Sequence, residues 1–167
     1  MAATIIKAER VTHPPVRFIG KHFDTYPNWG LAWAEDWFGT IEKAGKTADV
    51  NDGSYCVLVG QTESGIEFYL GEFMEADTPI PEGFDYADLP EMSAGLVYIK
   101  GKQDEVYSLT APDKRNILKA ALAEVGVNLS DSDSAPKRWM SFERDNCPRF
   151  TDPDADGNLI LDYALYL

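Results

Sequence analysis

The sequence predicts an α+β protein built from two β-α-β-β units related by pseudo-twofold symmetry, with antiparallel sheets, one helix per half and a ligand cleft between the halves. Two observations favour this class. The order strand, helix, strand, strand occurs twice, and a linker rich in proline and glycine (76–83) separates the two runs. Each unit leaves one sheet face to bury, so we expect a single domain over 1–167, with halves at about 9–76 and about 84–167.

The first half contains two turn signals and one bend that divide it into elements. The expected elements are a strand at 15–23, a helix from 28 or 30 to 44, and a hairpin of strands at 54–61 and 66–74. Extended chain from Ile5 leads into the first strand through a bend at Pro14 and Pro15, because proline cannot donate to a strand ladder. Gly45 is expected to end the helix.

The second half repeats this order. The expected elements are extended chain at 84–100, a helix from 110 to 126, a polar loop at 128–137, and strands at 138–145 and 159–167. Pro90 bends the extended stretch as the prolines near residue 14 do in the first half. Thr110 is a good helix N-cap and Pro112 suits a first turn, so we expect the helix to open there.

Three of the four tryptophans, Trp29, Trp33 and Trp37, stand four residues apart, so on a continuous helix they would form one stripe. Side chains of this size usually fill a core. They also make flat walls of ligand sites, because tryptophan offers a large area with little rotamer entropy to lose. The two interpretations are compatible, since one edge of the stripe can seal the core while the other faces a cleft.

The amino-acid composition limits the classes of partner that the chain can bind. The chain has 15 lysine and arginine residues against 28 aspartate and glutamate residues, which gives a net charge of −13. This balance disfavours direct nucleic-acid binding, which needs clustered cations, and it disfavours an anionic membrane surface. The N-terminal residues lack the layout of a signal peptide, and no apolar run is long enough to cross a membrane. We therefore expect a cytoplasmic protein.

Motifs for cofactors and metals are missing from the sequence. Cys56 and Cys147 have no metal-ligand spacing and are expected to be reduced thiols. The run 152–157 imitates the start of a calcium loop, but the twelfth position is Tyr163 where such a loop needs glutamate. A polar turn is the better interpretation, and we expect neither a cofactor nor a metal site.

A family resemblance extends from about residue 9 to the end of the chain. Its carriers are Trp33 and Trp37, Phe68-Tyr69-Leu70-Gly71, Pro79 to Phe84 with Leu89-Pro90, Phe142-Glu143-Arg144, and the closing run from Arg149 to Tyr163. In the order and spacing of these segments the chain resembles a stand-alone member of the GyrI-like small-molecule-binding family. That family is also found as the effector-binding domain of AraC-type and related multidrug-responsive regulators.

The resemblance implies a pair of units with a ligand cleft between them. Members of the family commonly combine a buried glutamate with aromatic rings to hold cationic or planar drugs, and Glu143 matches that glutamate. Two residues further on, where a tyrosine is common, this chain has Asp145. One wall of the cleft therefore departs from the family pattern.

Alternation along the strands predicts a similar lining without the resemblance. Trp139 and Glu143 share one face of their strand, and Glu67 and Tyr69 share one face of theirs. If the all-apolar faces meet the helices, these side chains point into the cleft; the alternative is a solvated outer face. The predicted ligand-binding residues, including two tyrosines on neighbouring strands, are Trp33, Trp37, Tyr55, Glu67, Tyr69, Tyr98, Trp139 and Glu143.

Three functions fit these observations. The first is a protein that sequesters or senses an aromatic or cationic small molecule, held by Glu143 and by cation–π contacts. The second, implied by the resemblance, is hydrolysis of a cyclopropanoid electrophile, with Glu143 as acid or base and Tyr69 assisting. The third is a protein-interaction role for the acidic surface, for which the family resemblance implies inhibition of DNA gyrase as one example. The sequence leaves the ligand and the oligomeric state open.

Overall fold

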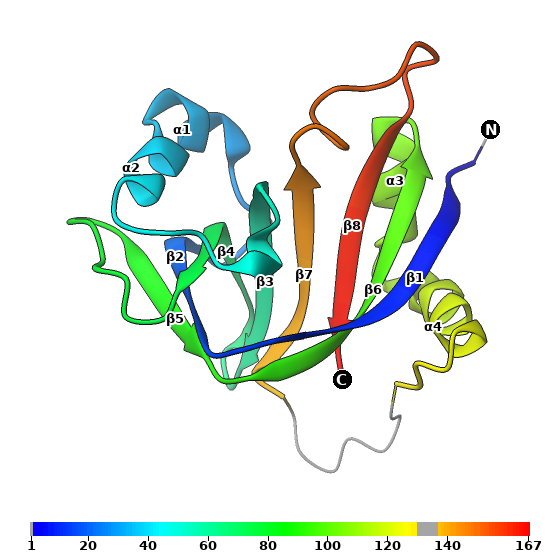
Figure 1. Cartoon of the computed structure of the whole chain (residues 1–167), viewed down its shortest axis with the longest axis horizontal. Coiled ribbons are helices and arrows are strands. Elements are labelled where there is room, and N and C mark those ends of the chain that lie inside the picture. Colours follow the sequence, from blue (N-terminus) through cyan, green and yellow to red (C-terminus); the bar gives the residue numbers. More distant parts are fainter. Residues whose placement is uncertain (1, 130–136) are drawn as a thin grey trace.

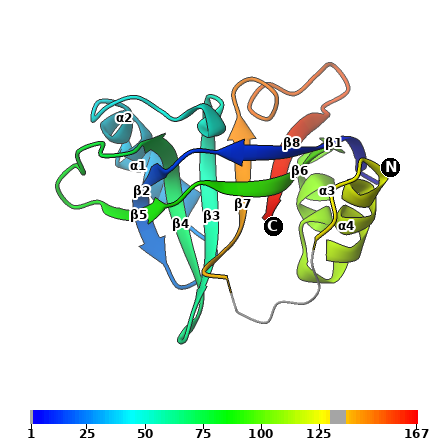
Figure 2. The same ribbon diagram turned by 60° about the horizontal axis from the view of Figure 1, so that its bottom comes forward.

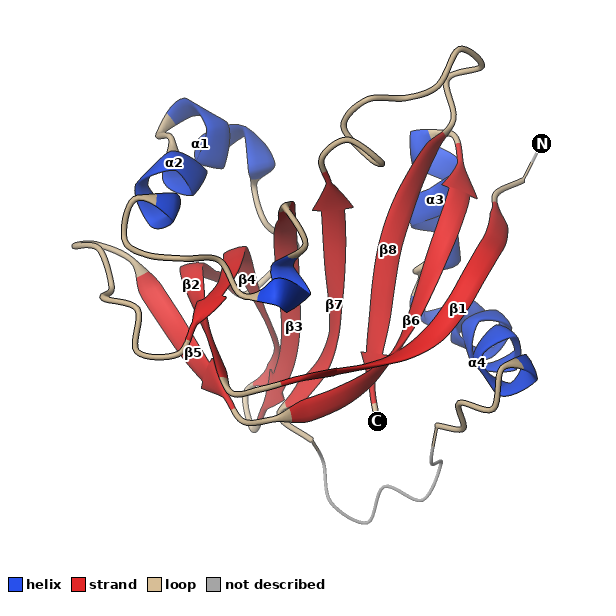
Figure 3. Cartoon of the chain, viewed as in Figure 1, coloured by secondary structure: helices blue, strands red, loops and turns tan. Residues whose placement is uncertain are grey.

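The computed structural model describes residues 2–129 and 137–167, and the strands of this part form one antiparallel sheet (Figures 1 and 3). In chain order the strands are β1 (Thr4–His13), β2 (Val16–Phe23), β3 (Ser54–Thr62), β4 (Gly65–Glu75), β5 (Asp85–Leu89), β6 (Met92–Gly101), β7 (Trp139–Asn146) and β8 (Leu159–Tyr166). The helices are α1 (Trp29–Ala34), α2 (Trp37–Glu42), α3 (Gln103–Leu109) and α4 (Arg115–Glu124), with short 3-10 turns η1 (Asp49–Asn51) and η2 (Pro112–Lys114). The predicted α+β class is confirmed.

Two β-α-β-β units supply the six central strands, and the units join where β3 pairs with β7. The order across the sheet is β1-β6-β8-β7-β3-β4-β2-β5. At the two ends of the joining ladder, Ser54 lies opposite Asn146 and Gly60 lies opposite Trp139. Because of this ladder the two sheets expected from the sequence are one continuous sheet. Each half also carries two helices where the sequence predicted one.

Both outer strands cross from one half to the other. β1 precedes β2 in the chain but pairs with β6, and β5 precedes β6 but pairs with β2. The strands change partner at Pro14-Pro15 and at Pro90, where the sequence predicted bends, because a proline cannot continue the ladder. Figure 2 shows β1 and β6 running side by side across the molecule. The exchanged strands therefore tie the halves together a second time.

The first predicted helix is broken in two, and the tryptophan stripe predicted from a continuous helix is wrong. Asp36 adopts a left-handed backbone with φ of 51°, which aspartate tolerates better than most residues, so α1 ends at Ala34 and α2 begins at Trp37. Trp37 is 4% exposed and packs against Phe23 in the core. Trp33, in contrast, is 53% exposed. The core and the ligand-site interpretations thus apply to different tryptophans.

The second predicted helix also differs from the structure. Helix α3 was not predicted, and Thr110 is its C-terminal cap and not the N-cap of the next helix, which begins at Arg115. The start of α3 is stabilised by Glu105, whose Oε1 accepts a hydrogen bond of 3.0 Å from the backbone N–H of Lys102. Of the polar loop expected at 128–137, residues 130–136 lie outside the described part of the chain.

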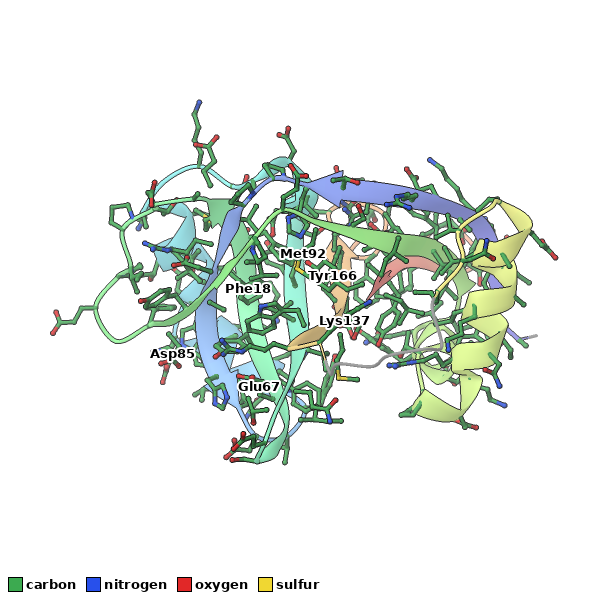
Figure 4. All side chains as sticks on the ribbon, turned by 90° about the horizontal axis from the view of Figure 1, so that it is seen from below. Phe18, Glu67, Asp85, Met92, Lys137 and Tyr166 are labelled. Carbon is green, nitrogen blue, oxygen red and sulfur yellow. The ribbon has the colours of Figure 1, made fainter. Side chains whose placement is uncertain are left out.

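The sheet has a helix-covered face and an opposite face that curls around an aromatic cluster. Residues directly opposite each other in adjacent strands share a face, which assigns each row of the sheet. One row on the helix-covered face is Leu70, Val57, Glu143, Tyr163 and Val97, and the next row, on the opposite face, is Tyr69, Leu58, Phe142, Ala164 and Leu96. In the cluster the Phe18 and Phe73 rings meet edge-on at 4.9 Å. Figure 4 views this face, with Phe18 and Tyr166 labelled.

Gly20 on β2 and Gly71 on β4 lie opposite each other where the two backbones approach closely. A Cβ atom on Gly71 would lie 2.0 Å from the backbone oxygen of Ile19. We expect Gly71→Ala to lower the free energy of unfolding by roughly 2–4 kcal/mol, because backbone and not a flexible side chain must move. Denaturant unfolding followed by circular dichroism measures the loss.

The control for this prediction is Gly30→Ala at the exposed start of α1. There an added Cβ meets only the side-chain oxygen of Asn28, at 3.3 Å, so the expected change is below about 1 kcal/mol in either direction. Equal losses in the two variants would show that the close approach of β2 and β4 is not needed for the fold.

Candidate functional site

A cavity of about 570 Å³ lies on the helix-covered face where the two halves meet. Its floor comes from β7, and α1 and α3 stand on its two sides (Figure 1). The lining residues are Tyr26, Trp29, Trp33 and Tyr55 from the first half and Gln103, Tyr107, Thr110, Glu143, Asp145, Phe150 and Thr151 from the second. The sequence predicted a cleft between the halves, and this cavity occupies that place.

Two carboxylic acids, Glu143 and Asp145, lie on the floor. They are alternate residues of β7, which puts both on the helix-covered face, and each is 4% exposed. The Tyr26 hydroxyl donates to Glu143 and lies 3.2 Å from Oε1 and 3.0 Å from Oε2. The Tyr107 hydroxyl lies 3.0 Å from Asp145 Oδ2 and 3.4 Å from Glu143 Oε2. One tyrosine from each half therefore holds the pair in place.

Burial of the two adjacent acids raises the pKa of each. Burial, and after it the charge of Asp145, raise the pKa of Glu143 well above its usual range. Burial raises the pKa of Asp145 to about 7, although its hydrogen bond with Glu143 acts in the opposite direction. Glu143 therefore holds a proton more readily than Asp145 does, because two adjacent buried carboxylates do not readily ionise together. Oδ1 of Asp145 has no hydrogen-bond partner among the described residues.

Aromatic rings form the walls and the mouth of the cavity. The Trp33 ring meets the Tyr55 ring edge-on, with centroids 4.9 Å apart. Nε1 of Trp29 donates to the Tyr26 hydroxyl at 3.3 Å, which connects the wall to the acids on the floor. Trp33 and Tyr26 are 53% and 49% exposed, so flat rings border the opening. Rings above a buried acid provide the contacts that a bulky apolar cation needs.

The predicted ligand-binding residues separate into three groups. Trp33, Tyr55 and Glu143 line the cavity. Trp37 lies in the core of the first half. Glu67, Tyr69, Tyr98 and Trp139 lie on the opposite face of the sheet, where Figure 4 labels Glu67. Tyr69 and Glu143 are therefore on different faces, and Tyr69 does not reach the acid that it was expected to assist.

The prediction from strand alternation failed because of one assumption and one irregularity. It assumed that only apolar side chains meet the helix side, whereas Glu143 lies opposite Val57 and Tyr163 on that side. The cavity separates the helices of the two halves at this point, so a polar side chain of β7 is accommodated there. In addition, the register shifts between Val59 and Gly60, which turns Trp139 onto the face opposite Glu143.

Eight residues of the lining were not among the predicted ligand-binding residues. They are Tyr26, Trp29, Gln103, Tyr107, Thr110, Asp145, Phe150 and Thr151. Alternation alone would have added Asp145, which is two residues after Glu143. The acidic run Asp104-Glu105 would have predicted a helix start and so the helix that carries Tyr107. Tyr26 and Phe150 lie in loops, where no periodicity identifies them.

Two further properties of the described residues bear on partners. Among them, no group of three or more histidine, cysteine, aspartate and glutamate side chains is arranged to hold a metal ion. In the same part of the chain, no helix combines the length and the apolar character needed to span a membrane.

Comparison with known proteins identifies structural neighbours only. No protein-family model matches the chain, and no curated protein matches it. The structure of SAV2435 bound to tetraphenylphosphonium superposes with a TM-score of 0.62 at 13% identity, over 96% of this chain and 93% of that chain. A Staphylococcus aureus MU50 protein assigned to bacterial transcription regulation gives 0.58 at 11% identity, over 96% and 97%.

A third neighbour is the C-terminal domain of EcmrR, with a TM-score of 0.54 at 12% identity, over 96% of each chain. At identities this low the likeness is one of fold alone. This chain is therefore similar in fold to a protein assigned to bacterial transcription regulation, to the C-terminal domain of EcmrR and to SAV2435, in agreement with the GyrI-like fold that the resemblance implied.

Proposed function

We propose that this chain binds lipophilic organic cations in the cavity between its halves, and so sequesters or senses them. The observation that carries the proposal is the buried pair of acids, Glu143 and Asp145, on the floor of an aromatic cavity. Among the described residues, the lining contains no lysine or arginine that would neutralise them. A buried carboxylate without a cation is costly to ionise, so it holds a proton until a cation replaces that proton.

The physical chemistry of the cavity suits an ion with an apolar coat. Each ring that faces a cation contributes roughly 0.5–2 kcal/mol, and the apolar coat adds the burial of its own surface. Once the cation is close, both acids can ionise, because its charge offsets their mutual repulsion. The net charge of −13 also favours the approach of cations from solution.

The structural neighbour SAV2435 supports this choice of chemistry, since it was solved with tetraphenylphosphonium, a bulky aromatic cation. This chain shares the fold over 96% of its length. Its own cavity supplies six aromatic side chains: Tyr26, Trp29, Trp33, Tyr55, Tyr107 and Phe150. Tetraphenylphosphonium is therefore the natural first probe for binding.

A hydrolytic role in the same cavity is a second candidate, favoured by one observation. Glu143 holds a proton beside Asp145, whose pKa is raised to about 7, and a general acid next to a base has this arrangement. Tyr26 and Tyr107 would take the assisting role once expected of Tyr69, because their hydroxyls reach the acids. Mass analysis of a cyclopropanoid electrophile after incubation with the protein separates hydrolysis from binding. If the compound is unchanged, binding is the only remaining candidate function.

The negative charge of the cavity floor should determine how tightly a cation binds. The double variant Glu143→Gln/Asp145→Asn should bind tetraphenylphosphonium roughly 100-fold more weakly, because neither amide can ionise against the cation while both keep an acceptor for the tyrosine hydroxyls. Quenching of the tryptophan fluorescence reports binding, since Trp29 and Trp33 line the cavity. Each single variant keeps one acid and should lose less.

Two controls accompany this prediction. Glu67→Gln removes an equally buried carboxylate, 5% exposed, from the opposite face and should leave the affinity within about twofold. Tetraphenylborate has the same shape as the probe but a negative charge, and it should not bind. If the anion binds as tightly as the cation, apolar contact and not charge explains the affinity.

The affinity for the cation should also depend on pH. Tetraphenylphosphonium keeps its charge at every pH, so its affinity should rise severalfold as the pH increases through about 7, the pKa of Asp145. The fold of the free protein responds in the opposite way: the stabilisation from the raised pKa of Asp145 is fully present below its ordinary pKa of 3.8, and it is lost as the pH rises from there through about 7. Fluorescence titrations on both sides of pH 7 test the prediction, and the double variant should give a flat profile.

A further inference from the structure

A second cavity, of about 690 Å³, lies beside the first one, and Tyr55 lines both. On one side Tyr55 lies directly opposite Asp145 of β7. On the other side, Val57 lies opposite Leu70 of β4. Tyr55 is two residues before Val57 and Glu72 is two residues after Leu70, so in this antiparallel pair Tyr55 and Glu72 lie on the same face. The two cavities therefore share the helix-covered face, each with a buried acid on its own side of Tyr55.

The acid of the second cavity, Glu72, is buried and held rigidly. It is 1% exposed, and its Oε1 accepts a hydrogen bond of 3.1 Å from Nδ2 of Asn51. Asn51 is itself fixed, because it donates to the backbone oxygen of Ser54 and accepts from the backbone N–H of Phe73 at 2.8 Å. Oε2 of Glu72 has no hydrogen-bond partner among the described residues. A rigid buried acid that belongs to the cavity lining thus has one acceptor oxygen without a donor.

The surroundings of Glu72 are acidic. Burial, and after it the charge of Glu42, raise the pKa of Glu72 to about 8, so the unliganded acid holds a proton as Glu143 does. Asp49 and Glu75 also line this cavity, and among the lining residues that the structure describes the only basic side chain is the exposed Lys46. A cation entering here would meet an excess of carboxylates and would replace the proton on the buried one.

We propose that the second cavity binds an ammonium group of the same ligand whose aromatic cation occupies the first cavity. This proposal rests on the proposed binding of lipophilic cations and names their class, which is elongated dications. An ammonium supplies the N–H donors that Oε2 of Glu72 lacks. Because Asp145 and Glu72 lie two strands apart, they are separated by roughly 10 Å, which a flexible alkyl linker can span.

Three triphenylphosphonium ions test the proposal, each with a hexyl tail that ends in an ammonium, a hydroxyl or a methyl group. The wild-type protein should bind the ammonium-tailed ion roughly tenfold more tightly than the hydroxyl-tailed one. Glu72→Gln should abolish this preference without changing the affinity for the hydroxyl-tailed ion. Glu63→Gln removes an exposed acid from the turn between β3 and β4, which lines neither cavity, and should keep the preference.

The outcomes separate this inference from the proposed function. If all three ions bind equally tightly, the second cavity is not an ammonium site, although the first cavity still binds cations. If none binds, the proposed function fails. The second cavity is then tested by itself: n-hexylammonium is added, and the NMR signal of the carboxyl carbon of Glu72 is followed. A shift of that signal supports the ammonium site, and no shift overturns it. A larger response to calcium also overturns it. This readout uses wild-type protein and does not depend on any variant folding.

Discussion

The antiparallel pairing of β3 with β7 is the contact on which the candidate site depends. It joins two units that would each leave an edge and a sheet face uncovered. Its register places Val57 opposite Glu143 and Tyr55 opposite Asp145, so an aromatic wall from one half stands next to the acids of the other. A shift of this register by one residue would turn the acids of β7 onto the other face and out of the cavity. The joint that completes the sheet is thus also the floor of the site.

Keeping two acids on that floor opposes stability, and the structure limits this cost in two ways. A proton on Glu143 prevents two adjacent negative charges, and the hydroxyls of Tyr26 and Tyr107 satisfy the carboxyl oxygens that they reach. Oδ1 of Asp145 has no donor among the described residues. Unsatisfied buried acceptors are rare in cores and common in sites that await a ligand. The exchanged strands β1 and β5 hold the halves together around this unfavourable centre.

The parts of the fold that depend on local patterns could be predicted from the sequence, and those that depend on backbone geometry could not. Strand positions, the linker and the bends at Pro14 and Pro90 follow from alternation and from the missing N–H of proline. The break of the first helix depends on left-handed Asp36, and the position of Trp139 depends on a register shift, and neither leaves a periodic signal. Glu143 was expected in the cleft and lines the cavity; its supporting tyrosines come from a loop and from an unpredicted helix.

The two acidic places on the helix-covered face differ in the cation that each suits. Glu143 and Asp145 are both buried among aromatic rings, so a cation there must lose its hydration, which an ion with charge spread under an apolar coat does at little cost. Glu72 is buried but its partner Glu42 is exposed, so a compact ammonium can meet the first acid while staying partly hydrated beside the second. Tyr55 separates these two environments. In the proposed binding mode the face would distinguish the two cationic ends of a ligand by their hydration, so a ligand with one end of each kind would bind in a single orientation.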